Sequence, residues 1–79
     1  MNELIGFVNG KNVRQKVLSL LSSKGEMDGK RISKTLRIVY PTIAKTLEEL
    51  EEKALITKKE EMYSLTETGV KIERMIQNI

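Results

Sequence analysis

The sequence predicts a mainly α-helical fold that carries one small β-hairpin. In five short segments, apolar residues recur at spacings of three and four, which is typical of helices with one buried face. Between residues 56 and 65, β-branched and aromatic residues lie on both sides of a polar pair and alternate with polar residues, as in a hairpin. The length of 79 residues suits one domain, so we expect a single domain over residues 1–79.

Two helices are expected in the first 25 residues. The first covers residues 2–8 and ends at Asn9-Gly10, because this dipeptide favours a turn. The second begins near Asn12, which we expect to cap the helix together with Gln15, and it ends at Gly25, which suits a left-handed cap. The apolar stripe of this second helix comprises Val13, Val17, Leu20 and Leu21.

The middle of the chain predicts a short strand and then two helices. Met27 fits a strand of one or two residues, and Asp28 is a good cap for a helix over residues 29–36. A tight turn at residues 37–39 leads into a helix from Tyr40 to Lys53, with a proline in its first turn, where a missing N–H costs nothing. The inward-facing residues of these two helices are Ile32, Leu36, Ile43, Leu47 and Leu50, with Leu55 beyond the second helix.

A hairpin and a last helix complete the chain. The hairpin strands are residues 56–59 and 62–65, and Glu60-Glu61 forms the tip between them. Either Thr66 or Thr68 then caps the last helix. The apolar face of this helix comprises Ile72, Met75, Ile76 and Ile79.

Two short helices joined by a three-residue turn and followed by a hairpin form a winged helix-turn-helix. In such a unit the second helix presents its N-terminal half to the major groove of DNA, and the first helix braces it. If the apolar stripe of the 40–53 helix is buried, Pro41, Lys45 and Glu48 lie on the outward face. The sequence therefore predicts that this helix recognises double-stranded DNA.

Three side chains of this helix suit contacts with bases. Thr42 can bond a base edge or a phosphate, Ala44 can touch a thymine methyl group, and Lys45 can reach a guanine edge or a phosphate. The C-terminal half is acidic, and we expect it to face solvent away from the phosphates; its residues are Glu48, Glu49, Glu51 and Glu52. The alternative is an amphipathic core helix with a solvated acidic face and no ligand.

The charge distribution is uneven along the chain. Residues 11–45 hold nine basic and two acidic residues, whereas residues 46–79 hold five basic and eight acidic ones. The first stretch therefore has a net charge of +7 and the second of −3, although the whole chain has only +3. A polarised surface of this kind suits a polyanionic partner, and the alternative is an ordinary solvated surface.

A family resemblance rests on two segments. Residues 32–56 resemble the core of prokaryotic, especially archaeal-type, winged-helix transcription regulators, akin to the MarR, ArsR or PadR groups. Residues 62–69 resemble the wing exit of these proteins, a Tyr-x-Leu-Thr-x-x-Gly pattern. The resemblance implies that the helix from Tyr40 reads the major groove, that the hairpin tip at 58–61 approaches the minor groove or the backbone, and that terminal helices form a homodimer.

The sequence departs from the family pattern in the turn and around the hairpin. Arg37 stands where such families often have glycine, Val39 where they have a capping serine or threonine, and Ala54 where they have glycine after the recognition helix. The acidic hairpin tip would be repelled by phosphates, so Lys58 and Lys59 at its base are better candidates for backbone contact.

The expected DNA-contacting residues come from both helices of the unit, the turn and the hairpin. Tyr40 either stacks on a sugar or phosphate or packs against the bracing helix, and Arg14 and Lys34 are weaker candidates. For the basic residues, the alternative is an ordinary solvated side chain. The full set is Lys30, Arg31, Arg37, Tyr40, Thr42, Ala44, Lys45, Lys58 and Lys59.

The apolar residues of the terminal helices have two interpretations. They either cover the small core of their own chain or pair with a second chain, which would place two recognition helices roughly 34 Å apart on a palindromic site. The expected homodimer contact comprises Leu4, Ile5, Val8, Ile72, Met75, Ile76 and Ile79.

The composition argues against catalysis and against a membrane location. The chain has no cysteine and no histidine, so disulfides are excluded and the commonest general base, the commonest metal ligand and the best nucleophile are missing. We expect no enzyme activity, no metal and no cofactor. Apolar runs are only a few residues long and the start is unlike a signal peptide, so we expect a soluble, cytoplasmic protein.

Three functions are consistent with these sequence features, and the least favoured is an RNA-binding or architectural role. The first is a sequence-specific DNA-binding transcriptional regulator, acting as a repressor. The alternative is a winged-helix module that binds a protein partner in a larger complex, which the acidic hairpin tip and the modest net charge favour.

Overall fold

The computed structural model describes residues 2–77 and confirms the predicted order of elements. The elements are α1 (Asn2–Asn9), α2 (Asn12–Lys24), β1 (Met27–Asp28), α3 (Gly29–Leu36), α4 (Tyr40–Glu52), β2 (Ile56–Lys59), β3 (Met62–Leu65) and α5 (Glu67–Gln77). Four of these match their expected bounds, namely α3, both hairpin strands and the two-residue β1. Ile79, the end of the expected last helix, lies outside the described residues.

The strands form one antiparallel sheet in the order β1-β3-β2. Met27 lies opposite Tyr63, and Ile56 lies opposite Leu65 in the hairpin. The two tip residues, Glu60 and Glu61, have φ of 50° and 70°. Positive φ at both central residues is the conformation of a two-residue type I′ turn, which favours asparagine and glycine over glutamate.

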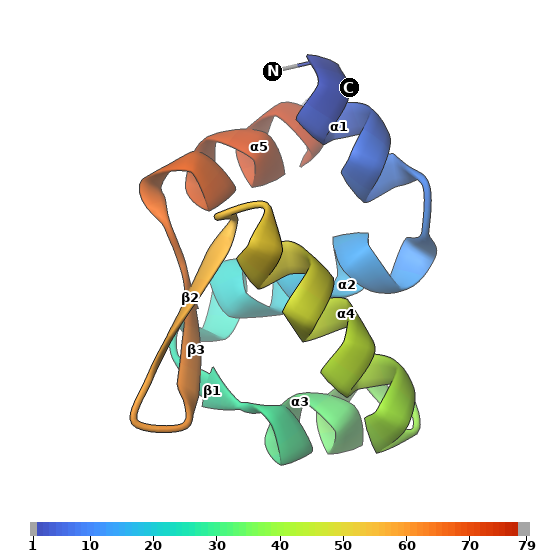
Figure 1. Ribbon diagram of the computed structural model, residues 1–79, viewed down its shortest axis with the longest axis vertical. Helices are drawn as coiled ribbons and strands as arrows, with labels where there is room; N and C mark the ends of the chain where they lie inside the picture. The colour runs from blue at the N-terminus through green and yellow to red at the C-terminus, as the bar shows by residue number, and fades with distance from the viewer. Residues whose placement is uncertain (1, 78–79) are drawn as a thin grey trace.

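The elements are arranged so that the two ends of the molecule differ. Figure 1 shows α1 and α5 at the upper end, whereas α3 and the start of α4 lie at the lower end. The sheet flanks α4 along one side, and contacts between α4 and β2 join the two. The first residues of α4 are therefore far from the terminal helices.

One hydrophobic core joins all the elements except the hairpin tip. The inward stripe predicted for α4 is confirmed, because Ile43, Leu47 and Leu50 are buried, and Leu55 is buried beyond the helix end. Leu18, which the predicted stripe of α2 left out, is buried as well. The complete set of buried hydrophobic residues is Val8, Val17, Leu18, Leu21, Met27, Ile32, Ile43, Leu47, Leu50, Leu55, Ile56 and Ile72.

Two residues of the expected dimer contact belong to this core. Val8 and Ile72 have no exposed surface, so their assignment to a contact with a second chain is wrong. Leu4, Ile5 and Ile76 are half-buried against the same core. The terminal helices therefore serve first to cover the core of their own chain.

The helix starts confirm two predicted caps and correct one. The Asp28 carboxylate accepts a hydrogen bond from the Arg31 N–H at 2.8 Å, and Thr66 Oγ1 accepts one from the Gly69 N–H at 3.0 Å. Thr66, rather than Thr68, is therefore the cap of α5. The expected capping pair at the start of α2 is wrong: the cap position lies one residue before Asn12, and the Gln15 side chain donates to Asn9 on the preceding helix.

Directly after α3 and shortly after α4, the chain passes through a non-glycine residue with left-handed backbone angles. Arg37 and Ala54 have φ of 58° and 59°. The next residue along the chain closes each helix end, since the Ile38 N–H donates to the Ser33 carbonyl and the Leu55 N–H to the Leu50 carbonyl. These bonds define the Schellman arrangement. The turn after α3 is therefore closed by hydrogen bonds without the flexibility of glycine.

The end of α4, the exit of the hairpin and the start of α5 meet at the backbone of Leu55. Its carbonyl accepts the Thr66 N–H at 3.1 Å, and Thr66 Oγ1 donates to the Ala54 carbonyl at 2.6 Å. Gly69 lies so close that an added Cβ would stand 2.0 Å from the Leu55 oxygen. The threonine and the glycine of the wing-exit pattern thus have a common structural reason, which is the close approach of α5 to this backbone.

These elements form a winged helix-turn-helix. The bracing helix α3 and the helix α4 are joined by the three-residue turn at 37–39, and the hairpin β2–β3 follows α4 as the wing. The fold predicted from the sequence is confirmed.

We expect Gly69→Ala to destabilise the domain by about 3 kcal/mol or more, because the new Cβ would overlap a backbone oxygen that cannot move without shifting the end of α4. Urea unfolding followed by circular dichroism measures the loss. Gly6→Ala is the matched control, since a Cβ there meets nothing within 4 Å and alanine favours the helix. Equal stability of the Gly69 variant and the unmodified chain would contradict the steric argument.

Candidate nucleic-acid interface

The helix α4 presents one face to the core and the opposite face to solvent. Pro41, Lys45 and Glu48 are exposed, as the helical spacing predicts. Thr46, which was not predicted to lie in the core, is buried, and its hydroxyl donates to the Thr42 carbonyl at 2.9 Å. The outward face of α4 is therefore open along its N-terminal half.

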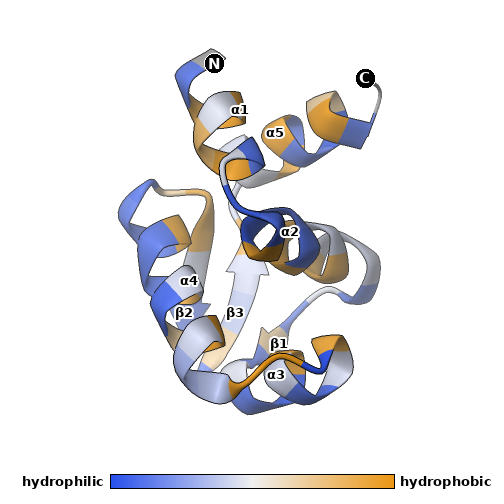
Figure 2. Cartoon of the chain, turned by 90° about the vertical axis from the view of Figure 1, so that its right-hand side faces the viewer, coloured by the Kyte–Doolittle hydropathy of each residue, from blue (hydrophilic) through white to orange (hydrophobic). Residues whose placement is uncertain are grey.

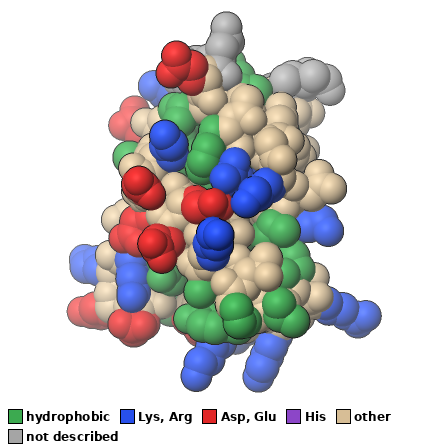
Figure 3. Space-filling view, turned by 45° about the vertical axis from the view of Figure 1, so that its right-hand side comes forward, with side chains coloured by type: hydrophobic (Ala, Val, Ile, Leu, Met, Phe, Trp, Pro, Cys, Tyr) green, Lys and Arg blue, Asp and Glu red, His purple; other side chains and the backbone are tan. Residues whose placement is uncertain are grey.

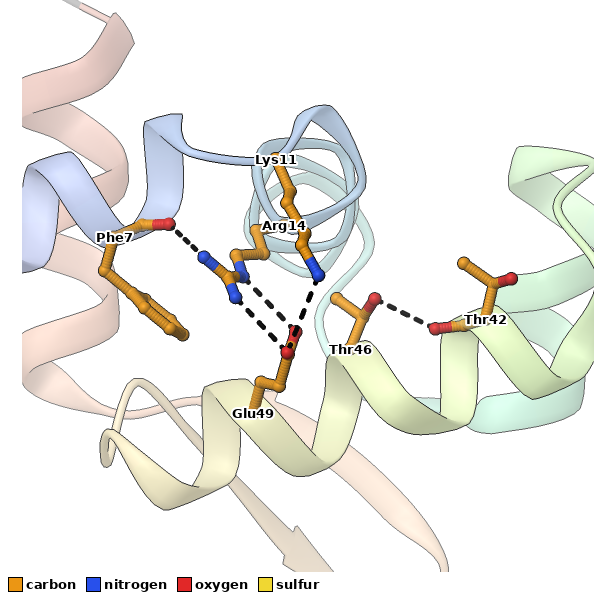
Figure 4. Close-up of polar contacts among 6 residues, drawn as sticks. All are labelled: Phe7, Lys11, Arg14, Thr42, Thr46 and Glu49. Carbon is orange, nitrogen blue, oxygen red and sulfur yellow. Dashed lines mark hydrogen bonds and ion pairs between the residues drawn. The ribbon is translucent and has the colours of Figure 1, made fainter.

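An ion pair fixes α4 from the side of α2. Figure 4 shows the Arg14 guanidinium between the Phe7 carbonyl and the Glu49 carboxylate. Arg14 Nη1 donates to the Phe7 oxygen at 2.6 Å, and its Nε and Nη2 lie 3.3 and 3.2 Å from the two Glu49 oxygens. The guanidinium carbon lies 3.8 Å from the centre of the Phe7 ring. One side chain thus connects α1, α2 and α4.

This pair corrects two expectations from the sequence. The side chains of Arg14 and Glu49 are only 12% and 23% exposed, so neither is a solvated surface residue and Arg14 is not free to contact DNA. The bond from Arg14 lowers the pKa of Glu49 below its ordinary value; partial burial opposes this, and the charges of Arg14, Lys11 and Lys45 add to the lowering. The carboxylate therefore stays ionised to a lower pH than a free glutamate.

The front end of α4 lies between two hollows that each contain basic side chains. On the wing side, the hollow is lined by Asp28, Gly29, Lys30, Tyr40, Lys58, Glu61 and Tyr63. On the α2 side, the hollow is lined by Lys11, Val13, Pro41, Thr42, Lys45, Thr46 and Glu49. The structure thus brings together Lys30, Tyr40 and Lys58 on one flank and Thr42 and Lys45 on the other.

Of the two sequence-based interpretations of Tyr40, packing against the bracing helix is confirmed and contact with a sugar or phosphate stays a prediction. Its ring packs against the start of α3, where an added Cβ on Gly29 would stand 3.3 Å from Tyr40 Cε1. The side chain is nevertheless 46% exposed. Tyr40 therefore joins the two helices of the unit and still faces solvent beside Lys30.

The remaining expected contact residues are spread more widely over the surface. Arg31 is exposed and lines a separate shallow hollow on α3, while Arg37 and Lys59 are exposed but line neither flank of α4. Lys58 forms an exposed ion pair with Glu61 at 3.7 Å, which is a weak interaction at a solvated surface. Ala44 is half-buried, so only part of its methyl group is open to a ligand.

Val39 was not among the residues predicted for the site. This residue directly precedes α4 and is 68% exposed, and it makes no side-chain bond to the helix start. Figure 2 shows the connection between α3 and α4 as a hydrophobic stretch, and Figure 3 shows hydrophobic side chains at the same lower end with basic side chains beside them. The sequence feature that could have identified Val39 is an apolar residue at a helix-cap position, where polar residues are favoured.

Neither a metal site nor a membrane span is found over residues 2–77. No group of three acidic residues in this range is placed to hold a metal ion. Within the same range, none of the helices has the length and apolar character needed to cross a membrane.

The fold and the open, partly basic face of α4 define a winged-helix domain of the kind found in regulators. The family model described as the N-terminal domain of the methanogenesis regulatory protein FilR1 matches residues 2–79. The chain therefore belongs to the FilR1 N-terminal domain family. The expectation of a regulator of winged-helix type is confirmed at this level, and the nearer kinship with the MarR, ArsR or PadR groups stays a prediction.

A solved structure supports the same class. The transcriptional repressor CouR, bound to p-coumaroyl-CoA, matches with a TM-score of 0.76 and 25% sequence identity. The match covers 84% of this chain and 49% of the repressor, so the chain spans about half the length of that protein. A comparison with curated protein sequences gives no match. Both matching proteins are named as regulators, which agrees with the expectation that the chain is not an enzyme.

We expect Glu49→Gln to reduce the stability at neutral pH by about 1–2 kcal/mol, because it leaves the Arg14 guanidinium without its anionic partner. Since the pKa of Glu49 is lowered in the folded chain, the pair contributes fully above the ordinary value of 4.5 and its contribution is lost as the pH falls through the folded value. Urea unfolding at several pH values should show the two chains converging below pH 4.5.

Glu52→Gln is the control, because Glu52 is exposed on the same helix. This variant should unfold like the unmodified chain across the whole pH range. A stability difference for Glu49→Gln that stays constant with pH would contradict the assigned role of the ion pair.

Proposed function

We propose that the chain binds double-stranded DNA sequence-specifically and acts as a transcriptional repressor, with α4 as the recognition helix. The observation that carries this proposal is the position of the front end of α4, which is exposed and lies between two hollows that contain lysines. A helix in the major groove has a phosphate backbone on each side. Lysines on both flanks of the helix match that geometry.

The charges along α4 favour entry by its N-terminal end. Lys45 lies on the outward face of the first half, with Lys11 on one flank and Lys30 on the other. The second half carries the exposed carboxylates of Glu51 and Glu52, which phosphates would repel. An oriented helix with its basic end in the groove keeps these carboxylates away from the backbone.

Each expected contact residue has a role in this arrangement. Thr42 and Lys45 reach base edges, and Ala44 offers only a methyl surface. Lys30 and Tyr40 contact phosphate on the wing side, where they line one hollow. The exposed basic residues farther from α4 contact the backbone; these are Arg31, Arg37, Lys58 and Lys59.

The named functions of the matching proteins support regulation over other uses of DNA binding. The family is that of a methanogenesis regulatory protein, and the solved structure is a transcriptional repressor. We extend to this chain the role of a DNA-binding regulator. We also retain the prediction that residues 1–79 form a single domain. The kinship with the MarR, ArsR or PadR groups stays part of the proposal.

A homodimer through the terminal helices completes the proposal. The contact would use the exposed Met75 and the half-buried Ile76 on α5, together with the half-buried Leu4 and Ile5 on α1. Both helices lie at the end of the molecule opposite the front end of α4. Two chains joined there would leave both recognition helices free. A palindromic site requires two such helices roughly 34 Å apart.

We expect Lys45→Ala to weaken binding to the preferred duplex by about 1–3 kcal/mol, because Lys45 is exposed on the outward face of the recognition helix. The duplex is selected from a random pool with the unmodified chain, and affinity is measured by fluorescence anisotropy at several salt concentrations. Lys71→Ala, which removes an exposed lysine on α5, should bind as the unmodified chain does.

The salt dependence separates DNA binding from the alternative of a protein-binding module. Contacts with several phosphates make the affinity fall steeply as salt rises. If no duplex is selected from the pool and the affinity for DNA does not change with salt, the proposal is overturned and a protein partner is favoured. Unchanged affinity of Lys45→Ala for a selected duplex would remove only that residue from the site.

We expect Met75→Glu to convert a dimer of the chain into monomers, because a carboxylate buried at an apolar contact loses its hydration. Sedimentation equilibrium measures the mass of each variant. Thr57→Glu, on the exposed face of the hairpin, should form an assembly of the same mass as the unmodified chain does. A monomeric unmodified chain at all concentrations tested would contradict the dimer.

A further inference from the structure

We infer that Val39 and Pro41, beside Tyr40, form an apolar edge that contacts the 5-methyl groups of thymines in the major groove. This inference rests on the proposed function and adds to it a class of DNA sequence. The preferred site would carry thymine where the apolar edge meets the base pairs.

The apolar edge is a continuous exposed surface. Val39 is 68% exposed and Tyr40 46% exposed, and Pro41 is exposed beside them. Single exposed apolar residues are ordinary on protein surfaces, whereas contiguous ones indicate a contact site. Figure 3 shows this end of the molecule with hydrophobic side chains gathered beside basic ones.

Folding alone does not explain a valine at this position. Val39 occupies the cap position of α4, where a serine, threonine, asparagine or aspartate side chain commonly accepts a hydrogen bond from the first turn. Valine makes no such bond, and its side chain lies outside the buried core. A residue that departs from local preference without a compensating contact in its own chain is expected at a functional site.

The backbone of the same turn does not suit a phosphate. Pro41 has no N–H, and the N–H groups of Thr42 and Ile43 donate to the Val39 carbonyl at 3.1 and 3.2 Å. The start of α4 therefore offers methyl and methylene groups rather than hydrogen-bond donors. Such a surface fits the floor of the groove better than the backbone.

Thymine is the base whose groove edge matches this surface. It presents a methyl group in the major groove, whereas the other three bases present polar atoms there. The lysines on both sides of α4 favour a polyanion over an apolar protein surface as the occupant. Charge and apolar surface together therefore select DNA that carries thymine.

The test replaces each thymine of the pool-selected duplex, one at a time, with deoxyuridine, which lacks only the methyl group. Binding of the full chain is measured for every substituted duplex. At one or two positions we expect the affinity to fall about three- to fivefold, which corresponds to the loss of one buried methyl group. The remaining thymines should tolerate the replacement.

The variant Val39→Ser links this loss to the apolar edge. Serine removes both methyl groups of valine and is a favoured residue at a helix cap, so thermal unfolding should show a domain about as stable as the unmodified chain. This variant should bind the thymine and deoxyuridine duplexes equally at the sensitive positions. Lys71→Ala, which changes an exposed residue on α5 at the opposite end of the molecule, should keep the discrimination.

The outcomes separate the two levels of the proposal. If the chain binds a selected duplex with a steep salt response and every deoxyuridine duplex binds equally, the methyl contact is wrong and the proposed function stands. If Val39→Ser keeps the full discrimination, the apolar edge is not its source and the inference is overturned. If no duplex is selected, the proposed function fails and the inference fails with it.

Discussion

The backbone at Leu55 is the point on which the geometry of this domain depends. The residue closes α4, directly precedes the hairpin, and accepts the hydrogen bond that brings the end of the hairpin back to the same place. Gly69 then lets α5 approach its carbonyl more closely than a side chain would permit. Because the helix, the wing and the last helix share this junction, a change in the angle between the wing and α4 would disturb the contacts with α5.

The other end of α4 is constrained by different means. Buried aliphatic residues hold one face to the core, and the Arg14–Glu49 ion pair fixes a second face to α2 and α1. What remains open is the strip that begins at Val39 and continues through Pro41 and Lys45. The exposed chemistry of the domain is therefore concentrated where the scaffold leaves the helix uncovered, which is a common arrangement for rigid binding surfaces.

The sequence predicted local features well because each one depends on neighbouring residues. The periodic apolar positions of α4, the Asp28 cap and the hairpin ends follow from spacing and residue type alone. The Arg14–Glu49 pair spans 35 residues and leaves no local pattern, so its partners were misjudged. For the same reason Val8 and Ile72 were assigned to a dimer: an apolar stripe does not reveal which surface covers it. The expected contact residues stay predictions, although several of them line the hollows beside α4. Val39 emerged only from its exposure.

The strained wing tip has a consequence for how such a domain would search a genome. Glu60 and Glu61 adopt left-handed backbone angles that asparagine and glycine would adopt more easily, and they place two carboxylates at the extremity of the hairpin. In the proposed complex, these charges weaken attraction to every stretch of duplex, because all stretches carry the same phosphates. Occupancy of the chosen operator depends on competition with a vast excess of other sequences. Because the operator carries the same phosphates, a repellent tip shortens residence on all sequences alike and leaves discrimination to the base contacts of α4.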